Sequence, residues 1–227
     1  MKYSLTLSLL SFLFISMTSA NIIYVKEGAV GDGTSWENAT GDLYEALQSA
    51  SEGTQIWVAE GTYYPTDCVQ CNDDQRNISF EIRDGIQLYG GFVGNETRLG
   101  QRKPKTNATT LSGNIGRDDL FDNSFTVVYM RHVSSNTILD GFIISDGNAD
   151  YISKHGNALG TGAGIYNDGS GGTSNPIIHD CIFMYNQAVQ GAAIFNNAVN
   201  GEASPILKNC SFVSNRAAKG GGAIFNY

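Results

Sequence analysis

The last third of the sequence repeats itself with a period of 29 residues. The segment from Pro176 to Ala188 returns at 205–217, with Pro, Ile, Cys, Phe, Asn and Ala recurring at an offset of 29. Each copy leads into a turn of small residues and an apolar exit, Gly191–Asn196 and Gly221–Asn226, and a related exit occupies Gly162–Asn167. Periods of about 20–50 residues indicate a solenoid, in which each unit buries its apolar face only by stacking on the next.

Short alternating runs fill one period. Leu207 and Phe212 are apolar, Lys208 and Ser211 beside them are polar, and the pattern breaks at Asn209, a residue type that tolerates left-handed turns. Such runs separated by Asn, Asp or Gly are typical of strands. Only three short strands and their turns fit into 29 residues. We therefore predict that each period is one coil of a parallel β-helix, with coils about 4.8 Å apart.

The upstream sequence has the same character with a weaker repeat. Degenerate coils are expected around 127–129 and 137–144, and further strands at 55–59, 80–82 and 86–89. The sequence predicts one helix, over Asp42–Ala50. Its apolar residues recur from Leu43 at i, i+3, i+4 and i+7, and Asp42 and Glu45 are spaced as a capping box. A solenoid needs its open end covered, so we expect this helix to cap the first coil.

The N-terminus has the pattern of an export signal. Lys2 precedes an apolar run, Leu5–Ile15, that is too short to span a membrane as a helix of about 20 residues, and small residues lead up to Ala20. We expect residues 1–20 to be a signal peptide, cleaved before Asn21; the alternative is an uncleaved anchor. The mature chain carries no second stretch of spanning length, which predicts an extracellular or outer-surface location.

Two sets of motifs resemble known secreted proteins. The exits at 162–165 and 221–224, together with Phe183-Met-Tyr-Asn186 and Phe212-Val-Ser-Asn215, resemble the Gly-Gly-Ala-Ile and Phe-x-x-Asn repeats of the chlamydial polymorphic outer membrane proteins. The N-terminal motifs Ile56-Trp-Val-Ala-Glu-Gly-Thr-Tyr63 and Leu88-Tyr-Gly-Gly-Phe92 are similar to the start of large secreted β-helix proteins of Bacteroidetes-type bacteria.

The resemblance implies an all-β, right-handed parallel β-helix at the cell surface or secreted, in a family whose members are often adhesins. We divide the mature chain into an N-terminal cap and first coil, 21–64, and further coils, 65–227, which we expect to be truncated at the C-terminus. Family members normally carry more repeats and a C-terminal anchor or secretion domain, whereas this sequence stops at Tyr227 within a repeat exit. We expect either that the chain continues into further repeats or that its open end self-associates.

Composition excludes some classes of partner. The formal net charge is −8, and charged residues make up 16% of the chain. Nucleic acids and anionic membranes require a concentrated basic patch, so neither is an expected partner. Glycans or surface proteins remain as candidate partners.

No catalytic or cofactor motif stands out. The repeat region from Pro176 onward holds just two acids, and one of them, Asp180, aligns with the turn residue Asn209. His132, His155 and His179 are isolated in sequence and lack metal-ligand spacing, and His179 aligns with Lys208, which predicts an outward side chain. We assign no catalytic, cofactor or metal residue. Calcium is the one cofactor that acidic loops could hold, through Asp73, Asp74, Asp118, Asp119 and Asp122.

The four cysteines form two unlike pairs. Cys68 and Cys71 are spaced for a local disulfide in an exposed loop, with a metal half-site or redox motif as alternatives. Cys181 and Cys210 recur at one coil position and should stack as small apolar fillers. Their separation would permit a bridge, but side chains in register point the same way, which favours free thiols.

The recurring residues are interpreted as structural. We expect Asn186 with Asn215, and Asn196 with Asn226, to form ladders beside turns. The positions assigned to the repeat are Phe183, Asn186, Gly191, Ile194, Asn196, Phe212, Asn215, Gly221, Gly222, Ile224 and Asn226.

Three hypotheses for function follow. The first is a non-catalytic, adhesin-like β-helix that binds glycans or proteins, because rigid stacked coils suit weak multivalent contacts. The second is a polysaccharide-active lyase or glycoside hydrolase, which would be supported by an acidic patch spanning adjacent coils. The third is a spacer that holds another domain away from the cell.

Overall fold

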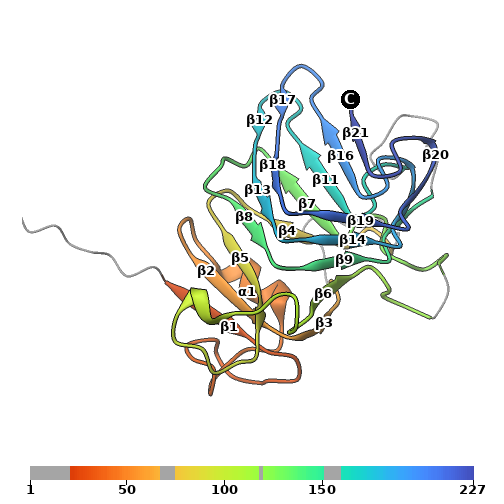
Figure 1. Cartoon of the computed structure of the whole chain (residues 1–227). Coiled ribbons are helices and arrows are strands. Elements are labelled where there is room, and N and C mark those ends of the chain that lie inside the picture. Colours follow the sequence, from red (N-terminus) through yellow and green to blue (C-terminus); the bar gives the residue numbers. More distant parts are fainter. Residues whose placement is uncertain (1–20, 67–74, 118–119, 151–159) are drawn as a thin grey trace, which may run out of the picture.

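The protein is a stack of β-strand coils closed at one end by a short helix (Figure 1). The computed structural model describes residues 21–66, 75–117, 120–150 and 160–227. The predicted signal peptide, Cys68, Cys71 and His155 lie outside the described residues. Strands that are far apart in sequence pair in parallel along the stack, which confirms the predicted parallel β-helix.

Three long sheets form the walls of the stack, and each takes one strand from successive coils. Sheet A consists of β1 (Ile22–Val25), β2 (Gln55–Ala59), β5 (Gln87–Phe92), β8 (Ile138–Asp140), β13 (Ile177–His179) and β18 (Ile206–Lys208). Sheet B consists of β3 (Gly61–Tyr63), β6 (Thr109–Ser112), β9 (Ile143–Ser145), β14 (Ile182–Met184) and β19 (Ser211–Val213). Sheet C consists of β4 (Phe80–Ile82), β7 (Val128–Arg131), β11 (Ile165–Asp168), β16 (Ile194–Asn197) and β21 (Ile224–Asn226).

The last coils contain more strands than the three per period that the sequence predicts. After a left-handed turn the chain is extended again and pairs with the same segment of the next coil. These short strands are β10 (Asn148–Ala149), β15 (Gln187–Gln190) and β20 (Arg216–Gly220), and β12 (Thr173–Ser174) and β17 (Glu202–Ala203). The 3₁₀ turn η1 (Leu99–Gln101) lies in a loop before β6.

The register reproduces the sequence repeat. Ile177 pairs with Ile206 and Ile165 with Ile194, both at an offset of 29, whereas Ile194 pairs with Ile224 at an offset of 30. The extra residue is absorbed by a register shift between β15 and β20.

Inward side chains form apolar columns along the axis. In sheet B, Leu111, Ile144 and Phe183 are 0% exposed and occupy equivalent positions in successive coils. Phe183 stacks on Phe212 of the next coil with ring centroids 5.1 Å apart. Cys181 is buried in the same core, and Cys210 packs against it while partly buried. Both thiols are free, as the sequence favoured, and burial raises the pKa of each.

The corners between sheets A and B are left-handed. Asp180 and Asn209 have φ of 49° and 53°, and Gly141 takes the same place one coil earlier with φ of 86°. Asp and Asn tolerate this conformation better than other residues with a side chain, which explains the aligned residue types. The predicted turn role of Asp180 is confirmed.

Two ladders of asparagines connect the coils, one at the corner after β14 and β19 and one within the strands of sheet C. The Asn186 amide nitrogen donates to Asn215 Oδ1 at 3.0 Å, and that of Asn196 donates to Asn226 Oδ1 at 2.7 Å. Asn167 extends the second ladder by donating to Asn196 Oδ1 at 3.0 Å. A ladder of this kind satisfies amide groups that would otherwise be buried without partners.

The helix α1 (Leu43–Ser49) covers the first coil, as predicted. Asp42 caps its N-terminus by accepting from the Glu45 backbone N–H at 3.0 Å, and Leu43 and Leu47 enter the apolar core. At the other end, the Arg83 guanidinium donates to the carbonyls of residues 47, 48 and 50, each at 2.8 Å. These bonds satisfy carbonyl groups that a helix end leaves without partners.

Candidate functional site

The outer face of sheet A carries a row of large side chains in register. Tyr24 pairs with Trp57, Trp57 with Tyr89, and Tyr89 with Asp140. From there the row continues through His179 to Lys208. The row is therefore aromatic on the N-terminal coils and polar or charged on the later ones.

The aromatic half of the row is covered by protein. Trp57 is 3% exposed and Tyr89 6% exposed, because they pack in a cluster with Phe92. Trp36 closes the cluster from outside, and its ring nitrogen donates to the Glu96 carbonyl at 2.9 Å. Buried rings cannot stack on a sugar, so this half is a structural cluster.

The polar half brings together four charged or titratable side chains from two coils and a loop. Asp140 Oδ2 accepts from Arg102 Nη2 at 2.6 Å and lies 3.2 Å from His179 Nδ1. The same His179 nitrogen lies 3.4 Å from Asp180 Oδ2. We call Arg102, Asp140, His179 and Asp180 the polar cluster.

The polar cluster has a buried floor and an open rim. The side chains of Asp140 and Arg102 are 10% and 12% exposed, whereas those of His179 and Asp180 are 31% and 33% exposed. The next coil extends the rim with the exposed Asn209, whose amide nitrogen lies 3.5 Å from His179 Nε2. A ligand approaching from solvent would meet His179 and Asp180 first.

The buried floor of the polar cluster contains one oxygen atom with an unmet hydrogen-bonding capacity. Asp140 Oδ1 is buried and has no hydrogen-bond partner among the residues that the structure describes. Arg102 is held in place by its bond to Asp140 and by its position over the Tyr89 ring, 5.3 Å from the centroid. Burial, followed by the nearby Asp140 charge, raises the pKa of Tyr89.

The sequence did not predict this cluster. His179 faces outward as expected, but its isolation in sequence does not hold in space, because the fold brings it against Asp140 and Asp180. Asp180 is at once the turn residue and a member of the cluster. The cluster could have been found by aligning residues 138–140 with 177–179, because this alignment places Asp140 one coil before His179.

The other sequence candidates lie elsewhere. His132 occupies a left-handed turn after β7, and its Nε2 lies 2.9 Å from the Ser170 carbonyl. Of the acidic loop residues considered for calcium, Asp122 accepts from the Arg117 backbone N–H at 2.6 Å. Asp73, Asp74, Asp118 and Asp119 lie outside the described residues, as do Cys68 and Cys71.

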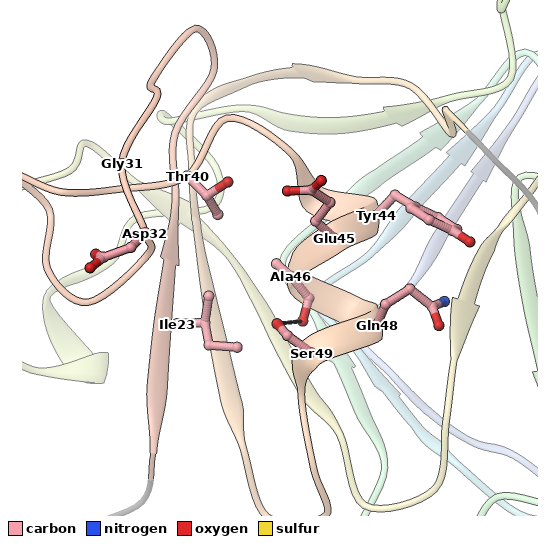
Figure 2. A pocket seen from close by; sticks show the side chains of 9 residues that line it. All are labelled: Ile23, Gly31, Asp32, Thr40, Tyr44, Glu45, Ala46, Gln48 and Ser49. Atoms are coloured by element: carbon pink, nitrogen blue, oxygen red, sulfur yellow. Dashed lines mark hydrogen bonds between the residues drawn. The ribbon is translucent and has the colours of Figure 1, made fainter.

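A shallow hollow of about 480 Å³ lies between the first coil and helix α1 (Figure 2). Two of its polar side chains bond within their own segments: Asp32 accepts from the Thr34 backbone N–H and hydroxyl, and the Ser49 hydroxyl donates to the Ala46 carbonyl. Figure 2 shows Asp32 and Glu45 on opposite walls of the hollow. The polar cluster is the stronger candidate site because its side chains point at one another.

No protein-family model, curated protein or solved structure matches this chain. Within the described residues, no helix is long and apolar enough to cross a membrane.

Proposed function

We propose that the protein is a secreted or cell-surface β-helix that binds a neutral glycan or a partner protein through the outer face of sheet A, without catalysis. The observation that carries the proposal is the polar cluster, in which the fold collects charged side chains from successive coils at a half-exposed place. Two sequence features support the same hypothesis: the repeat motifs resemble those of the polymorphic outer membrane proteins, and residues 1–20 have the pattern of an export signal.

The chemistry of the cluster suits hydroxyl-rich ligands. Carboxylates accept from sugar hydroxyls, while guanidinium and amide groups donate to their oxygens, and a rigid sheet holds all of these in fixed positions. The two carboxylates and the net charge of −8 disfavour acidic polysaccharides. Each contact of this kind is weak, so we expect affinity to come from several copies binding a repetitive ligand.

A polysaccharide-active enzyme is the second candidate, and one observation favours it. Asp140 and Asp180 come from adjacent coils, and Arg102 lies beside them, as a carboxylate-based lyase would require. The acceptor atoms of the cluster lie within 4.8 Å of one another. An inverting hydrolase needs roughly 6.5–9.5 Å between its carboxyl groups to admit water, so that mechanism fits poorly.

Binding to a glycan array is the experiment that tests the proposal. We expect the protein to bind a set of neutral glycans and Asp180→Asn to weaken that binding, because the substitution removes a rim charge while Asn209 shows that asparagine fits this turn. His132→Asn, at an exposed left-handed turn elsewhere, is the matched control and should bind normally.

The outcomes separate the three hypotheses. Cleavage of a bound glycan that Asp180→Asn abolishes would favour the enzyme. Absence of binding to any glycan or surface extract would favour the spacer. The location is tested separately: N-terminal sequencing of exported protein should begin at Asn21, and retention of Met1 would contradict cleavage of the signal peptide.

A further inference from the structure

Three potential metal ligands in the polar cluster are already close to coordination geometry. His179 Nδ1 lies 3.2 Å from Asp140 Oδ2 and 3.4 Å from Asp180 Oδ2. Zinc bonds to nitrogen and carboxylate oxygen are about 2.0–2.2 Å long, so ligand atoms around one ion are about 3.0–3.4 Å apart. The three atoms all lie within 4.8 Å of one another, and small side-chain rotations would bring them around one ion.

A second, independent observation points to a missing partner at this place. The Asp140 side chain is only 10% exposed, and its Oδ1 has no hydrogen-bond partner in the described part of the chain. A buried acceptor without a partner costs about 1–3 kcal/mol, and more when it is charged. Arg102 Nη2 and His179 Nδ1 both contact Oδ2, so an ion bound through Oδ2 would share that oxygen with Arg102, and Oδ1 is the oxygen left free for coordination.

We propose that Asp140, His179 and Asp180 bind a divalent transition-metal cation such as Zn²⁺. One imidazole and two carboxylates suit zinc or cobalt, whereas calcium and magnesium prefer all-oxygen sites. With three protein ligands the ion would keep an open position toward solvent, on the side where the rim is exposed. The ligands belong to the polar cluster that carries the glycan-binding proposal, but the test of cation binding does not depend on that proposal, because a cation can bind there whether or not a glycan does.

Residues around the ligands fit the role of a supporting shell. Arg102 donates to Asp140 and fixes the orientation of its carboxylate. Coordination through His179 Nδ1 leaves the proton on Nε2, where the Asn209 amide lies 3.5 Å away. Rotating that amide by half a turn would present its oxygen to the Nε2 proton, an assignment that an amide side chain permits.

A cation at this place would connect two coils, because Asp140 ends β8 while His179 and Asp180 follow one coil later. It would therefore stabilise the folded state by a free energy that grows with the logarithm of the cation concentration once this exceeds the dissociation constant. Binding is measurable both directly and as a rise in unfolding temperature.

The test uses the exported protein purified without a polyhistidine tag and stripped with a chelator. We expect saturable binding of one Zn²⁺ by calorimetry, and a Co²⁺ absorption spectrum without a thiolate charge-transfer band. His179→Gln should weaken Zn²⁺ binding at least about 10-fold, because even supporting residues contribute 10–100-fold. His132→Asn and His155→Gln are matched histidine controls and should bind as the parent does.

Asp180→Asn is the second variant, because Asn209 adopts the same left-handed turn one coil later, so asparagine should preserve it. It should weaken binding while leaving the urea unfolding curve of the metal-free protein unchanged. Three results would overturn the proposal: no saturable Zn²⁺ binding by the parent, unaltered binding by folded His179→Gln, or a Co²⁺ thiolate band that disappears with Cys68→Ser. A parent protein that binds Zn²⁺ but no glycan would contradict only the proposed function.

Discussion

Replacing Asn186 by leucine tests whether the asparagine ladder holds the coils together. The side chain is 0% exposed and spans two coil boundaries. Its amide nitrogen donates to the Ile144 carbonyl and to Asn215 Oδ1, both at 3.0 Å. Its oxygen accepts from the Gly147 backbone N–H, also at 3.0 Å. Leucine has nearly the same shape and can make none of these bonds.

The expected cost follows from the partners left behind. Two of them, the Ile144 carbonyl and the Gly147 N–H, are backbone groups whose bonds to Asn186 are buried. The Gly147 N–H would lose its partner, which costs about 1–3 kcal/mol, whereas the Ile144 carbonyl lies in the paired strand β9 and would lose one bond, worth about 0.5–1.5 kcal/mol. The free energy of unfolding should therefore fall by about 1.5–4.5 kcal/mol. In a protein of about 200 residues each kcal/mol corresponds to about 2–4 °C, so the unfolding temperature should fall by about 3 °C or more.

Urea unfolding followed by circular dichroism measures the effect. The control is Asn136→Leu, which makes the same chemical change at an exposed turn and should alter stability by less than about 0.5 kcal/mol. Asn215→Leu, at a partly exposed position of the same ladder, should be destabilising by a smaller amount. A loss below about 1 kcal/mol for Asn186→Leu would refute the reasoning, because it would mean that the stranded groups find other partners.

Three further predictions concern a corner, a loop and the last coil. Gly191 and Gly171 have similar φ, 60° and 68°, but a Cβ at Gly191 would lie 2.7 Å from the Ile194 carbonyl while Gly171 is open. Gly171→Ala should therefore lower the free energy of unfolding by about 1–2 kcal/mol, and Gly191→Ala should lower it by about 1–3 kcal/mol more. Equal urea midpoints for the two variants would contradict the steric clash expected at Gly191. Burial raises the pKa of Glu96, but hydrogen bonds from three backbone N–H groups outweigh it and lower this pKa below 4.5. The Glu96→Gln variant should therefore be less stable than the parent at pH 7, and this difference in stability should shrink as the pH falls through the pKa of Glu96 in the folded protein. A difference in urea midpoint that does not change with pH would contradict this. Chain 21–227 should self-associate through the outer edges of β18–β21; light scattering that shows monomers, unchanged by Ile224→Asp, would contradict it.

The repeating part of the fold could be predicted because its determinants are local. A period of 29 residues, short alternating runs and Asn209 at a corner together indicate stacked coils, and the observed register follows that period. The helix at Leu43–Ser49 could also be predicted, because its N-cap and its apolar spacing lie within one segment. The short strands around 187–190 were not predicted, because they are stabilised by the neighbouring coil and carry little alternation of their own.

The polar cluster was less accessible to prediction because the fold assembles it from distant segments. Asp140 and His179 are 39 residues apart, which is not the repeat period, since the intervening coil is longer. Arg102 enters from a loop before β6, and loop positions follow no period. Only the strand register shows that these side chains share one face.

The parallel register at an offset of 29 also has a mechanical consequence. Hydrogen bonds between coils run along the axis of the stack, so a force pulling the two ends apart loads them one coil at a time. In the last coils, each coil that peels away releases 29 or 30 residues, or about 100 Å of contour length, from a layer about 4.8 Å thick. The earlier coils are longer, since Ile56 pairs with Leu88 and Leu88 with Leu139. A stretched molecule would therefore lengthen in unequal steps and dissipate energy at each one, as an extensible tether does.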